Sequence, residues 1–427
     1  MRNTASKDIY YGWLIVAASF SITVIGGGIN SSLGVFALPM SDEFGWSRAL
    51  ISSAVAIGIL CSGLSQAFCG YLHDLIGGRK LIIVGILLVG IATILLSMTF
   101  NYLYFLILFG IVRSTLMSSI SITTIAVLVA KWFKKKRTTA MSIAASGGSV
   151  GGLLLVPFST YLIIVLDWRI TWFILGLVIL ILVLPTAYLI LRSEPSDIGL
   201  LPDGEDMGDN QSGTNGLYVE DGPLVVSSWK DAFNSYPMWQ LLSGYFVCGF
   251  TTLIMSFHFV PYAIEEGFSP STAAMAFGLL SIMNTIGVLM VGPVADKLGN
   301  KNLLGLVYFA RGIGYILLLF LPGQYGLWAF AIVGGASWIA SVPLTSTLTT
   351  NIYGLRKAGT LTGLVFMSHQ IGGSFGIQFG GIMRDLTGSY FVPFSIAGLT
   401  LIIASIASFT IQERKYSSRN ILVDNLG

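Results

Sequence analysis

The chain has 427 residues, of which 54% are hydrophobic and only 10% are charged, and its formal net charge is +3. Its mean hydropathy is +0.80. A soluble globular protein has about 25% charged residues, so this composition excludes an ordinary soluble domain. The slight positive charge argues against a nucleic-acid partner. No nucleotide-binding loop, metal-spaced Cys/His set or nucleophile-elbow motif occurs, so the sequence predicts neither an enzyme nor a cofactor or metal.

Apolar stretches follow one another along nearly the whole chain, each close to the ~20 residues that cross about 30 Å of hydrocarbon as a helix. Backbone polar groups find no water in a bilayer, so these stretches must be helical. The first begins at Tyr10 and continues past signal-peptide length without a cleavage site, which favours a permanent span. The twelve predicted spans are 12–35, 49–70, 81–98, 102–127, 139–163, 169–191, 237–260, 272–293, 303–321, 325–349, 359–382 and 391–411.

The basic residues are distributed unequally over the loops between these spans. With a cytoplasmic N-terminus, eighteen of the 23 Lys and Arg would lie on the cytoplasmic side, and three, Arg48, Arg169 and Arg384, on the other side. Such a bias places both termini in the cytoplasm. We therefore expect a multi-pass protein of the cell (plasma) membrane, surrounded by lipid and functional as a monomer.

The two halves of the chain repeat each other. A fixed shift of 222 residues pairs Glu43 with Glu265 and Asp74 with Asp296, together with several Gly and Pro at loop positions. Between the halves the chain is acidic and rich in Gly, Pro, Ser and Asn, as in a solvated linker. Parallel six-helix repeats with a substrate site between them are a transporter architecture. The predicted domains are a bundle over 1–192, a linker over 193–235, a bundle over 236–412 and a cytoplasmic tail over 413–427.

A charged turn follows the second span and is repeated after the eighth, with the sequences GYLHDLIGGRK at 70–80 and GPVADKLGNK at 292–301. A tight glycine turn places a helix-end carboxylate and neighbouring cations where they can bridge helices on the cytoplasmic face and latch one state of a rocking carrier. An ordinary charged turn is the alternative for each copy. The predicted gating residues are Gly70, Asp74, Gly77, Arg79, Lys80, Gly292, Asp296 and Gly299.

These two turns resemble the signature loop of the major facilitator superfamily. Further stretches, YGW at 11–13, EFGWS at 43–47, WFKKKR at 132–137 and HFVPY at 258–262, are similar to its monocarboxylate porter branch of bacterial and archaeal type. The resemblance implies an all-α membrane protein with twelve transmembrane helices in two pseudo-symmetric six-helix bundles. It also implies alternating access and, often, proton-linked transport of small carboxylates. Carboxylate-binding members usually carry an Arg in the eighth span where this chain has Val288, and some carry an acid where it has Asn284.

Charges within the predicted spans are positive. All twenty acidic residues lie in loops, linker, tails or helix ends, whereas Arg113, Arg311, His258 and His369 lie at membrane depth. Burying an unpaired charge costs at least ~2.5–3.5 kcal/mol on insertion scales, so these side chains need a wet cavity or a partner, and an anionic substrate is the simplest one. In the superfamily it resembles, the fourth helix lines the cavity and the ninth is peripheral, which makes Arg113 the better candidate. Structural hydrogen bonds and a packing or snorkelling Arg311 are the alternatives.

Histidines titrate near neutral pH, so the two within the spans are the evident proton carriers if coupling exists. Four further polar residues, Asn30, Asn284, Trp338 and Gln370, complete the candidate site, with helix packing as the competing interpretation. Cys61, Cys69 and Cys248 fall inside spans and are interpreted as apolar packing residues. Glycines four residues apart, Gly148 with Gly152 and the series Gly372, Gly376 and Gly380, predict close helix contacts. The predicted substrate-binding residues are Asn30, Arg113, His258, Asn284, Arg311, Trp338, His369 and Gln370.

Taken together, these patterns predict a secondary active transporter for a small organic anion. A monocarboxylate is the leading interpretation, with alternating access as the mechanism and a proton as the candidate coupling ion. The alternatives are an exporter of amphipathic drugs or a carrier of neutral metabolites, and more remotely a non-transporting membrane sensor. The absence of an intramembrane acid argues against a cation exporter, because such exporters usually exchange protons for cations at a carboxylate.

Overall fold

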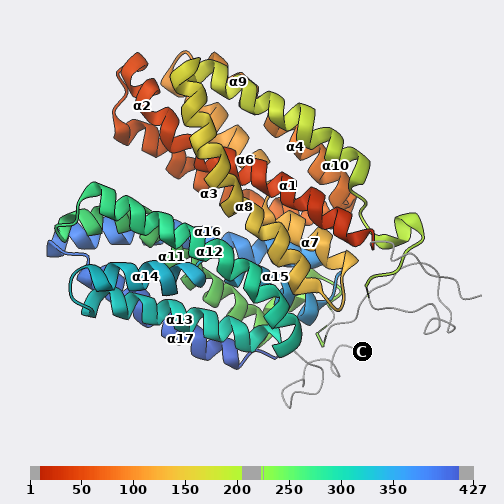
Figure 1. Cartoon of the computed structure of the whole chain (residues 1–427). Coiled ribbons are helices and arrows are strands. Elements are labelled where there is room, and N and C mark those ends of the chain that lie inside the picture. The colour runs from red at the N-terminus through yellow and green to blue at the C-terminus, as the bar shows by residue number, and fades with distance from the viewer. Residues whose placement is uncertain (1–9, 204–222, 225, 413–427) are drawn as a thin grey trace, which may run out of the picture.

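Long helices joined by short turns make up the computed structural model, which describes residues 10–203, 223–224 and 226–412 (Figure 1). Eleven helical stretches in these ranges are long and apolar enough to cross a membrane. The remaining predicted span, α16 (Ala358–Thr387), has 30 residues but is rich in Gly, Ser and Thr, which lowers its hydropathy. The prediction of an all-helical membrane protein is confirmed for the described residues.

The helices of the first half run in chain order from residue 12 to residue 190. Several extend one or two turns beyond the predicted spans, because their polar ends stay helical outside the hydrocarbon. They are α1 (Gly12–Ser31) with α2 (Leu33–Phe44), α3 (Arg48–Ile76), α4 (Gly78–Leu95), the segmented fourth span α5 (Tyr102–Phe105), η2 (Leu106–Arg113), α6 (Ser114–Met117), η3 (Ser118–Ile120) and α7 (Ile122–Trp132), then α8 (Arg137–Val165), and α9 (Trp168–Val178) with η4 (Ile179–Val183) and α10 (Leu184–Ile190).

The helices of the second half repeat this order after two short 3₁₀ turns in the linker, η5 (Pro195–Ile198) and η7 (Trp229–Asn234). They are α11 (Tyr236–Glu265), α12 (Pro270–Leu298), α13 (Asn300–Phe320), the divided tenth span α14 (Gln324–Ala336) and α15 (Ser341–Tyr353), then α16 and α17 (Phe391–Phe409). The irregular fourth and tenth spans are features that the hydropathy pattern does not predict.

The helices bury two separate hydrophobic cores. One is made by residues from Ile15 to Leu191, and the other by residues from Leu224 to Ile411. The two helix groups meet at the end where the described parts of the linker lie, called the linker end below, and spread apart toward the opposite end, called the far end (Figure 1). The predicted tail 413–427 and residues 204–222 and 225 of the predicted linker lie outside the described residues, so the domain boundaries stay a prediction.

Repeated sequence signals begin and end the equivalent helices of the two halves. Ser47 and Ser269, which are 222 residues apart, each accept a hydrogen bond from the backbone N–H three residues later, at the starts of α3 and α12. This is the N-capping arrangement that satisfies a helix's first donors. The same helices end at Gly77 (φ +85°) and Gly299 (φ +90°), in a backbone conformation that residues with a Cβ rarely adopt.

Close helix contacts within each half depend on glycine. In the first half, α8 approaches α1 through Gly147 and Gly151, one residue before the predicted pair Gly148 and Gly152, because the helix turns those positions toward α1. An added Cβ at Gly151 would lie 2.0 Å from the Val24 carbonyl oxygen. In the second half, the predicted Gly372, Gly376 and Gly380 do face α11, where an added Cβ at Gly372 would lie 2.1 Å from a backbone oxygen.

Substitutions at two adjacent glycines of α8 test this contact. An added Cβ at Gly147 would lie 2.1 Å from Thr23 Oγ1, whereas one at Gly148 meets nothing within 4 Å. Alanine is otherwise favoured over glycine in a helix by roughly 0.5–1 kcal/mol. We therefore expect Gly147→Ala to lower the thermal unfolding midpoint of the protein in detergent, and the matched control Gly148→Ala to keep or raise it. Equal midpoints would contradict the packing described here.

Candidate functional site

Asp74, in the last turn of α3, binds the other half of the molecule. Its carboxylate accepts hydrogen bonds from the backbone N–H groups of Gly359 and Thr360, at 2.8 Å each, and from the Thr360 hydroxyl at 2.7 Å. These donors lie in the first turn of α16, where the helix dipole favours a negative charge. One turn earlier, Gly70 packs so closely that an added Cβ would lie 2.1 Å from the Gly359 oxygen. We call this contact the α16 latch.

Asp296 makes the equivalent contact in the opposite direction. Its carboxylate accepts hydrogen bonds from the backbone N–H groups of Thr138 and Thr139, at 2.9 Å each, and from the Thr139 hydroxyl at 2.6 Å. These donors begin α8, so each half caps a helix of the other half. Gly292 allows the approach, since an added Cβ there would lie 2.7 Å from the Thr139 Cα atom. We call this contact the α8 latch.

The other predicted gating residues shape the turns rather than bridge the halves. Gly77 and Gly299 supply the positive φ angles that end α3 and α12. Arg79 turns back to its own half, where Nη2 donates to the Tyr188 carbonyl at 3.0 Å, and Lys80 is exposed. The bridging partners of the two carboxylates are therefore helix N–H groups and threonine hydroxyls of the other half, whereas Arg79 links two helices of its own half.

Contacts between the halves continue from the latches toward the middle of the molecule. Between α3 and α16, Gly363 packs against the Gln66 carbonyl, and Gly63 packs against the Gln370 side chain, with added Cβ atoms at 2.5 and 2.6 Å. Between α8 and α12, Asn284 Nδ2 donates to Ser149 Oγ at 2.9 Å. The halves are thus joined along the linker end and the middle of the spans.

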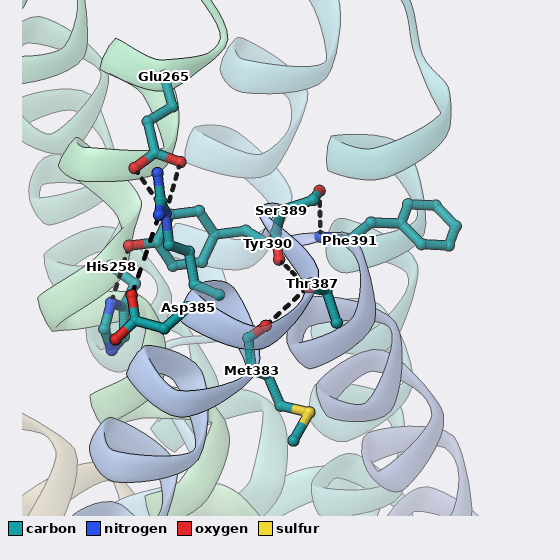
Figure 2. Close-up of polar contacts among 9 residues, drawn as sticks. His258, Glu265, Met383, Asp385, Thr387, Ser389, Tyr390 and Phe391 are labelled. Carbon is teal, nitrogen blue, oxygen red and sulfur yellow. Dashed lines mark hydrogen bonds and ion pairs between the residues drawn. The ribbon is translucent and has the colours of Figure 1, made fainter.

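The ion pairs at the far end stay within one half. Glu265, at the end of α11, accepts from Arg384 Nε at 3.1 and 3.3 Å, and Arg384 also approaches Asp385 at 3.9 Å (Figure 2). Its repeat partner Glu43 binds Arg169 in the first half. Each glutamate ties the end of its half's first helix to residues that flank the turn between the fifth and sixth helices.

His258 lies beside this far-end ion pair and links three elements of the second half (Figure 2). Nε2 lies 3.0 Å from the Ile377 carbonyl oxygen on α16, and Nδ1 lies 3.2 Å from the Tyr390 hydroxyl before α17. A carbonyl oxygen can only accept, so Nε2 is the ring nitrogen that donates to Ile377. The side chain therefore joins α11 to α16 and to the residue that precedes α17.

Arg113 is buried inside the first half. It ends the π-helical segment η2, and its Nε donates to Thr93 Oγ1 on α4 at 3.2 Å. Its guanidinium carbon lies 5.5 Å from the ring centre of Phe109 and 6.0 Å from that of Trp172 on α9. Neither Nη1 nor Nη2 has a hydrogen-bond partner among the described residues. The side chain thus faces α4 and α9 of its own half, and not the second half.

Arg311 is buried inside the second half, where both of its Nη groups donate hydrogen bonds and its Nε has no hydrogen-bond partner among the described residues. Nη1 donates to Thr252 Oγ1 at 3.2 Å and to Cys248 Sγ at 3.4 Å, both on α11. Nη2 donates to the backbone carbonyls of Ser337 and Trp338, between α14 and α15. Cys248, predicted to be an apolar packing residue, is therefore part of a polar cluster. Sequence offers no signal for this contact, because it joins residues on separate spans.

The remaining candidates fall into one group and one isolated residue. Asn284 accepts from the Ile339 backbone N–H at 3.0 Å, which places it beside Trp338 and the Arg311 cluster. His369 Nδ1 lies 3.1 Å from Gln370 Oε1, and His369 also interacts with Cys248. The structure thus brings Arg311, Trp338, Asn284, His369 and Gln370 into one region of the second half. Asn30 is exposed on α1 of the other half.

Comparisons with known proteins agree with this architecture. A family model described as Major Facilitator Superfamily matches residues 18–377. The chain is 26% identical to an uncharacterized MFS-type transporter, YcxA of Bacillus subtilis, over 96% of this chain and 98% of that protein. It is 24% identical to monocarboxylate transporter 12 of Homo sapiens, over 95% of this chain and 81% of that protein. The solved structure of the E. coli fucose:proton symporter FucP superposes with a TM-score of 0.71 and 19% identity, over 92% of this chain and 97% of that one.

Neutralising a latch should loosen the linker end. Asp296→Asn keeps the shape of the side chain but loses the charge that favours the α8 N-terminus, an interaction of about 0.3–1 kcal/mol in exposed settings and up to ~2 kcal/mol when partly buried. We expect spin labels at Lys135→Cys and Arg356→Cys, one on each half, to show a larger population of long distances in this variant. Asp385→Asn, at an exposed position of the far end, is the matched control. Unchanged distances in Asp296→Asn would show that the carboxylate does not hold the halves together.

Proposed function

This chain belongs to the major facilitator superfamily of membrane transporters, and we propose that it moves a small organic anion, a monocarboxylate, by alternating access coupled to a proton. Its relatives and its fold are those of transporters and not of enzymes. The proposal concerns the cargo, the coupling ion and the direction in which the molecule faces. We take the cell membrane as its location, with both termini in the cytoplasm, on the distribution of Lys and Arg.

The charge of the buried interior is the observation that carries the proposal. Arg113 and Arg311 are 1% and 0% exposed in the two cores, and neither forms an ion pair with an acidic residue among the described ranges. Two uncompensated guanidinium groups at membrane depth create a positive potential that favours an anion and opposes a cation. Neutral metabolites and amphipathic cations would gain nothing from this arrangement.

The two latches support alternating access. They lie at repeat-equivalent positions, and each joins a carboxylate of one half to a helix N-terminus of the other, so both must open for the linker end to separate. With the linker end in the cytoplasm, this structure corresponds to a state that is closed toward the cytoplasm. Hydrogen bonds to helix ends suit such a latch, because they form and break without leaving a charge buried in hydrocarbon.

We place the cargo between the halves, near Asn284, His369 and Gln370. Asn284 and Gln370 contact residues of the other half, and the positive charge of Arg311 lies behind them. Val288, one helical turn after Asn284 on α12, is buried and apolar. Asn284 is therefore the side chain of this helix that we expect to hydrogen-bond to the cargo. The similarity to proteins named monocarboxylate transporters favours a monocarboxylate within the class of small anions.

Uptake by proteoliposomes tests the cargo. We expect labelled lactate, pyruvate or formate to enter, faster with an inward proton gradient, with oxalate as the dicarboxylate comparison. Arg113→Gln removes buried charge and should lower uptake by about tenfold or more, the effect of ~1.4 kcal/mol, whereas Arg113→Lys should retain a larger part. Lys230→Gln in the exposed linker is the control. Uptake of a neutral or cationic compound, with no carboxylate transported under any gradient, would contradict the anion proposal.

The pH dependence of uptake tests His258 as the proton carrier. Proton-coupled uptake draws on the inward proton gradient, so it should rise as the outer pH is lowered. His258→Gln should flatten this dependence. His369→Gln is the comparison, because it removes the other histidine of the spans and should leave the pH profile in place. An unchanged profile in His258→Gln would remove this residue from the coupling.

A further inference from the structure

The tenth span is divided by a break whose cause lies in the sequence. Pro343 has no backbone N–H, and its ring clashes with the carbonyl four residues earlier, that of Ile339. The helix α14 ends at Ala336, residues 337–340 form turns, and α15 begins at Ser341. The Val342 N–H bonds to the Ile339 carbonyl at 2.9 Å, a three-residue bond in place of the usual four.

The break frees backbone groups that side chains of neighbouring helices then bind. Arg311 Nη2, from α13, donates to the freed carbonyls of Ser337 and Trp338. Asn284 Oδ1, from α12, accepts from the freed N–H of Ile339 at 3.0 Å. A buried polar backbone group without a partner destabilises the fold, and hydrocarbon holds no water to supply a partner. The break is therefore stable only with these two side chains in place.

The fourth span of the first half is interrupted at the equivalent place. The segment η3 ends at Ile120, and Ser121 is extended (φ −67°, ψ 161°) before α7 begins. Here the hydroxyl of Ser118 donates to the Ser62 carbonyl at 2.9 Å and lies 2.8 Å from Ser65 Oγ. Ser62 stands 222 residues before Asn284, so repeat-equivalent positions of α3 and α12 contact the two breaks. The arrangement is thus part of the repeated architecture.

Asn284 differs from Ser62 in reaching across to the other half. Its Nδ2 donates to Ser149 Oγ on α8 at 2.9 Å, while its Oδ1 holds Ile339. The same pair of helices, α8 and α12, carries the α8 latch formed by Asp296. The bond from Asn284 to Ser149 and the α8 latch therefore depend on the same approach of α8 to α12.

We propose that Arg311 and Asn284 are positioning residues that hold the tenth span broken, and that the Asn284–Ser149 bond couples this break to the approach of the two halves. The inference rests on the proposed alternating-access function, and it gives Arg311 a role other than direct contact with cargo. In this arrangement, α15 bends relative to α14 when α8 leaves α12. The linker-end part of the tenth span then moves with the opening of the latches.

A double-mutant cycle in thermal stability tests the positioning role without reference to transport. Arg311→Met leaves the carbonyls of Ser337 and Trp338 without donors, so we expect a lowered unfolding midpoint in detergent. Pro343→Ala supplies the missing N–H for the Ile339 carbonyl and removes the ring clash. The helix can then become regular, and its own N–H groups can bind the carbonyls of Ser337 and Trp338. We therefore expect the double variant to recover at least half of the loss. Additive effects of the two substitutions would overturn the proposal. Arg311→Lys, which keeps the charge but not the planar fork, serves if the Met variant does not purify.

Spin-label distances test the coupling. Labels at Tyr325→Cys and Arg356→Cys flank the tenth span, and labels at Lys135→Cys and Arg356→Cys report the separation of the halves. We expect Asp296→Asn and Ser149→Ala each to shift the first distance, with the larger separation of the halves in Asp296→Asn. Halves that separate while the first distance stays constant would overturn the coupling and leave alternating access intact. Halves that do not separate in Asp296→Asn would instead contradict the latch on which the proposed function depends.

Discussion

Every backbone polar group within the spans must find its hydrogen-bond partner in the protein itself, and the structure follows from this requirement. It makes the apolar stretches helical, and it decides where a helix can depart from regular geometry. The tenth span breaks beside Pro343, and Arg311 and Asn284 bind the groups that the break releases. Burying the same side chains at that depth without such partners would cost free energy. The first role to consider for a polar residue in these spans is therefore a hydrogen bond to a backbone group that has no other partner.

The requirement also explains how the two halves hold each other. The first N–H groups of α8 and α16 have no partner within their own helices, and a carboxylate from the opposite half supplies one. Asp74 and Asp296 thus act at helix ends, where a negative charge is favoured and solvent is near. A closure made in this way is strong enough to define a state and weak enough to be released. Glycines at positions 70 and 292 let the helices come close enough for these bonds.

Sequence alone predicts the spans and the repeat, because hydropathy and helix-end residues such as Glu43 and Glu265 carry them directly. It also predicts that the signature carboxylates lie at helix ends. It does not predict their partners, since Gly359 and Thr138 take part through backbone groups that any residue has. Nor does it predict the direction in which Arg113 points, because the π-helical turn that ends at Arg113 leaves no mark in hydropathy. The cluster of Cys248 with Arg311 depends on packing between α11 and α13, which no periodicity encodes.

The two buried arginines differ in how many of their N–H groups are hydrogen-bonded. Arg311 has four hydrogen bonds to fixed groups of the second half, so its charge acts on its surroundings while both of its Nη groups stay engaged. Arg113 has one hydrogen bond and two aromatic neighbours, and its Nη atoms lack hydrogen-bond partners among the described residues. Neutral partners leave the net charge of both groups in place. We propose that a cargo entering between the halves meets a positive potential from both sides, which favours an anion even without a guanidinium in direct contact with it.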